Sequence, residues 1–129
     1  IASGLNPGNY RLVDGSGVSH YNLVTAELLL GVLKYFYYEQ PELYRLLSDS
    51  FPFSGVDGTL KNRMRGSAAE NNVKAKTGTL SGISCLSGYV NAKNGDIIAF
   101  SIMIQNHFGK TSRATGYQNR IYEILAEYE

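Results

Sequence analysis

An Asn-Gly pair between two apolar segments constrains the fold of this chain more than any other feature. Residues 84–91 and 97–105 have the composition of strands, and Asn94-Gly95 lies between them. Asn-Gly favours a tight hairpin because both residues tolerate a positive φ. We therefore predict that the two segments form an antiparallel hairpin, with a third strand at residues 73–79 beside it.

Helical periodicity dominates the first half of the chain. Apolar residues recur every three or four positions from residue 25 to 39, Thr25 is a suitable N-cap, and Pro41 begins a second helix that runs to about Asp49. Three shorter elements complete the prediction: a strand at 9–14, one or two helical turns at 59–64 and a helix at 120–128. This order predicts an α+β fold in which helices pack on an antiparallel sheet.

Composition excludes several classes of protein. The 129 residues make one domain, and 12 Lys and Arg against 11 Asp and Glu exclude a polybasic nucleic-acid arm. Cys85 is the single cysteine, so no internal disulfide forms, and with two histidines it is too few for a structural zinc site. We expect no metal and no cofactor. Because the chain begins at Ile1 rather than Met, we expect residues 1–129 to be one fragment of a longer protein.

The segment Lys76-Thr77-Gly78-Thr79 has the composition of an anion-binding strand. Lysine offers a positive charge to a carboxylate, the threonine hydroxyls offer donors, and glycine lets a ligand come close. An extended peptide can also pair with the edge of such a strand. The alternative is a solvated strand end, which is the better interpretation of a Lys-Thr-Gly tripeptide considered alone.

A second candidate group is the polar loop that precedes the first helix. Ser19 and Asn22 are small polar residues that follow a glycine-rich turn. The alternative is that Asn22 or Thr25 only caps the helix and that Ser19 is an ordinary turn residue.

Four segments in a fixed order carry a family resemblance. They are DGSGVS (14–19) leading into NLVT (22–25), GVDGTL (55–60), VKAKTGTLSG (73–82) and CLSGYV (85–90). In this order they resemble the C-terminal part of the D-alanyl-D-alanine carboxypeptidases of peptidase family S13, the class C low-molecular-mass penicillin-binding proteins. The resemblance runs from about residue 10 to residue 105. It implies the C-terminal part of a transpeptidase fold like that of serine β-lactamases and penicillin-binding proteins.

The resemblance also implies roles for individual residues. Ser19 is expected to relay a proton to the leaving amine, and Asn22 to orient the substrate amide. Lys76 and Thr77, within the Lys-Thr-Gly motif that Gly78 completes, are expected to hold the terminal carboxylate of the substrate. The backbone N–H of Thr79 is expected to be one of two oxyanion-hole donors.

Two departures from the family pattern qualify these roles. The spacing Ser19-x-x-Asn22 is one residue longer than Ser-x-Asn, and Tyr21 occupies the expected asparagine position. No Ser-x-x-Lys motif, which carries the nucleophile in this family, occurs in the 129 residues. We therefore expect that the nucleophile lies in a missing N-terminal part and that this fragment alone is inactive.

The resemblance implies partners and a location as well. The expected ligands are peptidoglycan stem peptides and β-lactams, and no nucleic acid is expected. The parent protein is expected to cleave the stem peptides as a carboxypeptidase or endopeptidase, through an acyl-enzyme. The expected location is periplasmic or extracytoplasmic. The fragment's uncovered edge and apolar face favour a homo-dimer. The alternative function is a non-catalytic peptidoglycan-binding or assembly module of the same fold.

Overall fold

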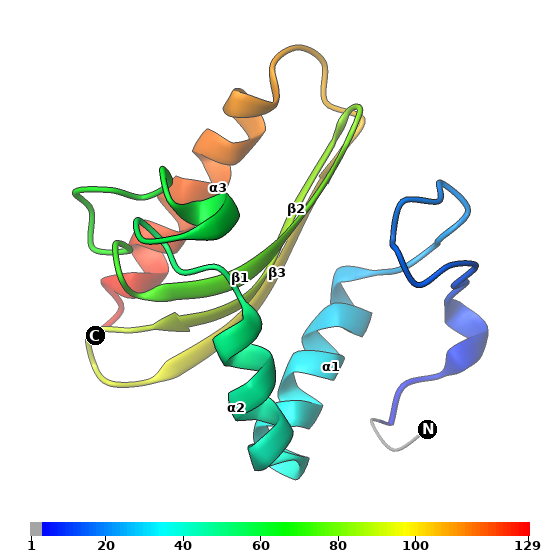
Figure 1. Ribbon diagram of the computed structural model, residues 1–129, viewed down its shortest axis with the longest axis horizontal. Coiled ribbons are helices and arrows are strands. Elements are labelled where there is room, and N and C mark those ends of the chain that lie inside the picture. Colours follow the sequence, from blue (N-terminus) through cyan, green and yellow to red (C-terminus); the bar gives the residue numbers. More distant parts are fainter. Residues whose placement is uncertain (1–3) are drawn as a thin grey trace.

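The chain has an α+β fold built on one three-stranded antiparallel sheet (Figure 1). The computed structural model describes residues 4–129. Its elements, in chain order, are η1 (Pro7–Asn9), α1 (Ala26–Glu39), α2 (Pro41–Ser50), η2 (Gly58–Leu60), β1 (Val73–Leu80), β2 (Ile83–Asn91), β3 (Ile97–Gln105) and α3 (Thr111–Ala126). The strand order is β1-β2-β3, so the predicted fold class and sheet are confirmed.

Helices cover both faces of the sheet. In Figure 1, α1 and α2 lie on one side of the strands and α3 on the other. The hydroxyl of Tyr89 donates to the carbonyl oxygen of Leu33 in α1, whereas the hydroxyl of Tyr122 in α3 donates to that of Leu86. Among residues 4–129, no helix is long and apolar enough to cross a membrane.

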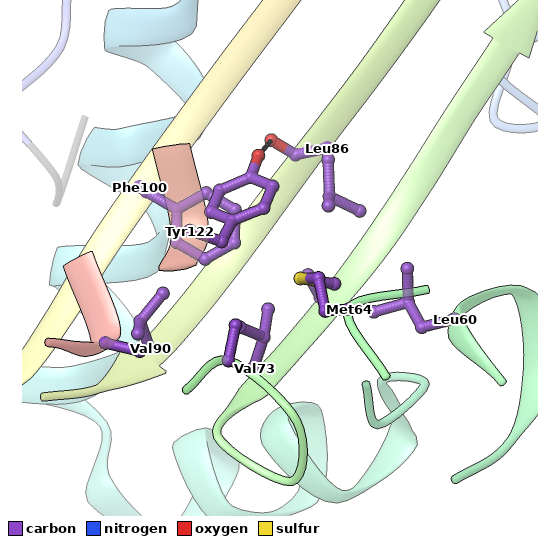
Figure 2. Packing of buried hydrophobic residues seen from close by; sticks show 10 residues of the cluster. Leu60, Met64, Val73, Leu86, Val90, Phe100 and Tyr122 are labelled. Carbon is purple, nitrogen blue, oxygen red and sulfur yellow. Dashed lines mark hydrogen bonds between the residues drawn. The ribbon is translucent and has the colours of Figure 1, made fainter. Parts of the chain in front are cut away.

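The main core lies between the sheet and α3. Figure 2 shows the ring of Tyr122 against that of Phe100, with their centroids 4.4 Å apart. Leu86 and Val90 of β2 and Val73 of β1 are fully buried in the same cluster. Leu60 and Met64, from the long connection between α2 and β1, belong to the same cluster.

The helix boundaries before the sheet follow the sequence closely. The Thr25 side chain accepts a hydrogen bond from the N–H of Leu28, as an N-cap does. Helix α1 begins directly after Thr25, at Ala26. Pro41 occupies the first turn of α2, where its missing N–H is not needed. The predicted helices at 25–39 and 41–49 are therefore confirmed to within a residue.

Two predicted elements differ from the structure. Residues 9–14 form no strand: they pair with the rest of the described chain only through one bridge between Arg11 and Leu23. Helix α3 begins at Thr111, nine residues before the predicted start at 120. Its first half was missed because the inward residues there are Ala114 and Gln118, which give no apolar periodicity.

The hairpin between β2 and β3 joins the predicted strands by a looser turn than Asn-Gly suggests. Five residues, 92–96, connect Asn91 to Ile97, and within them Gly95 has a φ of +92° while Asn94 keeps a negative φ. The reason is tertiary: the N–H of Lys93 donates to the carbonyl oxygen of Ala126. The turn therefore caps the C-terminal end of α3 and takes its shape from that contact.

Gly88 in β2 is required by close packing of the strands. It pairs with Ala75 of β1, and a Cβ at position 88 would lie 2.1 Å from the carbonyl oxygen of Lys74 and 2.7 Å from the Ala75 Cβ. These distances are far below van der Waals contact, so a side chain at this position forces the two strands apart.

We predict that Gly88→Ala lowers the free energy of unfolding by about 1–3 kcal/mol or more, as overpacking of a tight core does. The matched control is Gly116→Ala in α3, where a new Cβ meets nothing within 4 Å. That substitution should be neutral or stabilising because alanine favours the helix. Urea denaturation of both variants measures the difference, and equal stabilities would contradict this account of β1–β2 packing.

Candidate active site

One edge of strand β1 is covered along only half of its length. The N–H of Ser54 donates to the carbonyl oxygen of Val73 at 2.9 Å, and the N–H of Ala75 donates to that of Pro52 at 3.1 Å. Residues 52–54 thus pair with the first part of β1 on the side opposite β2. The polar backbone groups of Val73 and Ala75 therefore point toward this outer edge.

The remaining part of the same edge is open. Because backbone direction alternates along a strand, the N–H and C=O groups of Thr77 and Thr79 point outward like those of Ala75. Within residues 4–129, no hydrogen-bond acceptor reaches the N–H of Thr77 or Thr79. Two free backbone donors at a sheet edge can bind an extended peptide or a developing negative charge.

Side chains of the Lys-Thr-Gly segment surround this open edge. Lys76 is exposed, and its Nζ donates to the carbonyl oxygen of Thr77 at 2.9 Å. The Thr77 hydroxyl donates to the Thr59 hydroxyl of η2 at 3.1 Å. A flexible ammonium group, a hydroxyl and two free N–H groups therefore lie along one short stretch of strand, which suits a carboxylate ligand.

The described residues leave room for a Cβ at Gly78. A Cβ at this position would contact only the Cys85 Cβ, at an ordinary 3.5 Å. No described residue therefore requires glycine here, in contrast to Gly88. The half-buried Cys85 is the cross-strand partner of Gly78, and burial raises the pKa of its thiol, which keeps it protonated and unreactive.

The loop of residues 13–22 is closed by two side chains, Asp14 and Asn22. The Asn22 amide oxygen accepts from the N–H of Val13 at 2.8 Å, and its amide nitrogen donates to the Asp14 carboxylate at 3.0 Å. The same carboxylate accepts from the N–H groups of Gly17 at 2.8 Å and Ser19 at 3.0 Å. The hydrogen bond from Asn22 lowers the pKa of Asp14 most, and the hydrogen bonds from the backbone N–H groups lower it further.

Among residues 4–129, no acceptor takes the hydroxyl hydrogen of Ser19. Its hydroxyl oxygen accepts a hydrogen bond from the N–H of Tyr21 at 3.2 Å. That contact uses a lone pair, so the hydroxyl hydrogen is available to a further acceptor. Asn22 differs, because both ends of its amide are engaged within the loop.

The loop of residues 13–22 lies on the side of the sheet toward which Lys76 projects, whereas Thr77 shares the opposite face of β1 with Val73 and Ala75. In Figure 1 the loop lies beyond the N-terminal end of α1, on the side of the sheet away from α3. Lys76 shares a face of β1 with Lys74, which forms an ion pair with Asp49 of α2 at 2.8 Å. No hydrogen bond between residues 4–129 joins Ser19 or Asn22 to the Lys76–Thr79 segment.

Two contributors to the site were not predicted from the sequence. Asp14 was not among the predicted site residues, although an aspartate followed by Gly, Ser and Gly is the composition of a carboxylate-capped loop. Thr59 belonged to a recognised segment, but nothing in the sequence indicated its contact with Thr77. Among residues 4–129, no three His, Cys, Asp or Glu side chains gather where they could hold a metal ion.

Comparison with known sequences identifies relatives along almost the entire chain. The model of the D-Ala-D-Ala carboxypeptidase 3 (S13) family matches residues 2–128. A D-alanyl-D-alanine carboxypeptidase of Actinomadura sp. (strain R39) is 44% identical over 97% of this chain and 23% of its own length. The carboxypeptidase DacB of Haemophilus influenzae is 35% identical over 97% of this chain and 28% of its own length.

Solved structures of similar proteins share the fold of this chain, and the chain again matches only part of their length. Penicillin-binding protein 4 (dacB) of Haemophilus influenzae, in complex with a β-lactam, matches 94% of this chain and 30% of its own chain, at 33% identity and a TM-score of 0.83. An endopeptidase of Bdellovibrio bacteriovorus, Bd3459, shares the fold with a TM-score of 0.71 at 21% identity. The chain thus spans about a quarter of the length of its curated relatives.

The hydrogen bonds of Asp14 predict an acid-sensitive loop. Its low native pKa means that the charged carboxylate stabilises the loop at pH values above the unfolded-state pKa near 3.8. This contribution is lost as the pH falls through the lower native pKa. We expect the amide protection factors of Gly17 and Ser19 to fall at acid pH in the wild type and already at neutral pH in Asp14→Asn.

Amide hydrogen exchange followed by NMR measures these protection factors. The matched control is Asp96→Asn in the β2–β3 turn, whose carboxylate bonds to Asn94 rather than to this loop. Protection that stays unchanged in Asp14→Asn would show that the carboxylate does not hold the loop.

Proposed function

Because the chain belongs to the D-Ala-D-Ala carboxypeptidase 3 (S13) family, we propose that it supplies the carboxylate-binding half of a serine acyl-transfer active site. The observation that carries this proposal is the open edge of β1 at Thr77 and Thr79, with the exposed Lys76 beside it. The complete protein, in this proposal, is a D-Ala-D-Ala carboxypeptidase or endopeptidase. It hydrolyses peptidoglycan stem peptides through an acyl-enzyme intermediate.

The residues of this chain have distinct roles in the proposed reaction. Lys76 and the Thr77 hydroxyl bind the terminal carboxylate of the peptide, and the N–H of Thr79 donates to the oxyanion of the tetrahedral intermediate. Gly78 leaves room for the segment that carries the nucleophilic serine. Ser19, whose hydroxyl hydrogen is free, passes a proton to the leaving amine.

Asn22 acts in this proposal by holding the loop that carries Ser19. Its amide bonds to Val13 and Asp14, so it reaches a substrate amide only by exchanging one of these hydrogen bonds. The nucleophile itself comes from outside the 129 residues, because they contain no Ser-x-x-Lys motif. The chain on its own is therefore proposed to be inactive.

The ligands and the location follow from the same proposal. A β-lactam presents a carboxylate and a reactive carbonyl group in one molecule, so it fits the same donors as the stem peptide. The solved relative from Haemophilus influenzae was complexed with a β-lactam, which supports β-lactams as ligands of this protein. Peptidoglycan lies outside the cytoplasmic membrane, and we place the complete protein there.

One observation favours a second candidate function. The absence of Ser-x-x-Lys from these residues is what a non-catalytic peptidoglycan-binding module of the same fold would also show. Such a module would still bind a peptide carboxylate through Lys76 and Thr77, but it would form no covalent intermediate.

Covalent labelling of the full-length protein separates the two functions. We expect incubation with benzylpenicillin to add one acyl group, detected by intact mass and placed by peptide mapping on a serine outside this chain. Heat-denatured protein is the control for non-specific acylation. An adduct on a serine within the 129 residues would contradict the proposed division of the site, and no adduct would favour the binding module.

Substitution of Thr79 tests its backbone N–H. Thr79→Pro removes this donor at an outward-facing edge position, where a strand tolerates proline. We expect the full-length variant to fold and to be acylated by benzylpenicillin about 100- to 1,000-fold more slowly than the wild type, the usual cost of losing an oxyanion donor.

Thr79→Val is the matched control for this substitution. It removes the hydroxyl but keeps the backbone N–H, so its acylation rate should remain close to that of the wild type. Stopped-flow acylation kinetics measure both variants. Equal slowing of Thr79→Val and Thr79→Pro would assign the role to the side-chain hydroxyl, which both variants lack, and a normal rate for Thr79→Pro would contradict the role of the N–H.

A further inference from the structure

Thr77 requires something to fix its side chain if its hydroxyl is to meet a carboxylate at the edge of β1. Threonine has a hydroxyl and a methyl group on the same carbon, and rotation about χ1 exchanges their positions. Within residues 4–129, the Thr77 hydroxyl makes one hydrogen bond, of 3.1 Å, to the Thr59 hydroxyl. Thr59 thus determines which of the two groups lies at the rim of the open edge.

The segment that carries Thr59 is firmly held. Leu60, its neighbour, is fully buried in the main core. The N–H of Gly55 donates to the carbonyl oxygen of Leu60 at 3.0 Å, and the Asp57 carboxylate accepts from the N–H of Phe53 at 2.7 Å. These contacts tie η2 to the same segment, 52–54, that pairs with β1. The backbone of Thr59 therefore has a fixed position relative to the strand.

The direction of the hydrogen bond gives Thr59 a second role. Without a ligand, Thr77 donates its only hydroxyl hydrogen to Thr59. To bind a carboxylate, Thr77 must turn that hydrogen toward the ligand, and its oxygen can then accept the hydrogen that Thr59 carries. Thr59 is exposed, so its hydroxyl is free to rotate. Thr77 then keeps a hydrogen-bond partner in both states.

From this geometry we infer that Thr59 is a positioning residue for the carboxylate site. It orients the Thr77 hydroxyl toward the open edge and accepts or donates a hydrogen bond as the ligand leaves or binds. The inference rests on the proposed function, since it assigns the carboxylate to Lys76 and Thr77. Thr59 acts through Thr77 and touches neither the reacting carbonyl group nor the nucleophile.

A pair of ligands separates this role from a merely structural one. Benzylpenicillin carries the free carboxylate, whereas its methyl ester has the same ring and a blocked carboxylate. In the full-length protein, we expect Thr59→Val to lower the second-order acylation constant for benzylpenicillin about tenfold, or about 1.4 kcal/mol, and that for the ester by less than about twofold. Thr59→Ser keeps the hydroxyl and should retain the wild-type constant.

The control is Thr115→Val, an equal change in α3, where the hydroxyl, within residues 4–129, donates to the carbonyl oxygen of Ser112 in its own helix. Thr59→Val that reacts with benzylpenicillin as fast as the wild type would overturn the inference, and so would equal losses for both ligands. In either case acylation of the wild type leaves the proposed function intact. A wild type that neither ligand acylates would overturn the proposed function and this inference with it.

Discussion

The pairing of residues 52–54 with the first half of strand β1 is the interaction on which the site depends. It satisfies outward backbone groups of Val73 and Ala75 and extends no further along the strand. Within residues 4–129, the outward N–H groups of Thr77 and Thr79 therefore stay free. An unpaired strand edge normally invites aggregation, and proteins tend to cover it. Here the same strand has a covered, structural half and an open half that carries the Lys-Thr-Gly motif. The connection that covers the first half also brings Thr59 to the second.

Two glycines of the sheet, Gly88 and Gly78, also differ in whether the packing of the strands requires them. Gly88 lies where the strands pack so closely that a Cβ would meet backbone atoms of β1. At Gly78, on the neighbouring strand, a Cβ would meet only the Cys85 Cβ, at an ordinary contact distance. The packing of the fold requires the first glycine, whereas no described residue requires the second. The loop that carries Ser19 depends in turn on the Asp14 carboxylate rather than on buried apolar contacts.

The sequence predicted those parts of the fold in which local signals and tertiary contacts agree. Strand β3 occupies its predicted bounds, 97–105, because apolar alternation and the preceding turn indicate the same structure. The turn type was not predictable, since the end of α3 determines it through Lys93. The start of α3 was hidden because the buried Gln118 reads as a surface residue, although its side chain donates to the carbonyl oxygen of Ser84. Local patterns cannot show contacts between residues so distant in sequence.

For the candidate site, the sequence indicated candidate residues, whose roles stay predictions, but not the bonds between them. The Lys76–Thr79 segment was singled out by its composition, while the open edge that makes its N–H groups available became evident only from the pairing of residues 52–54. The most direct test of the central claim is a crystal structure of the full-length protein acylated by benzylpenicillin. The account predicts the ligand carboxylate at Lys76 Nζ and Thr77 Oγ1, and the acyl oxygen about 2.7–3.1 Å from the N–H of Thr79. A ligand bound with its carboxylate away from β1 would contradict it.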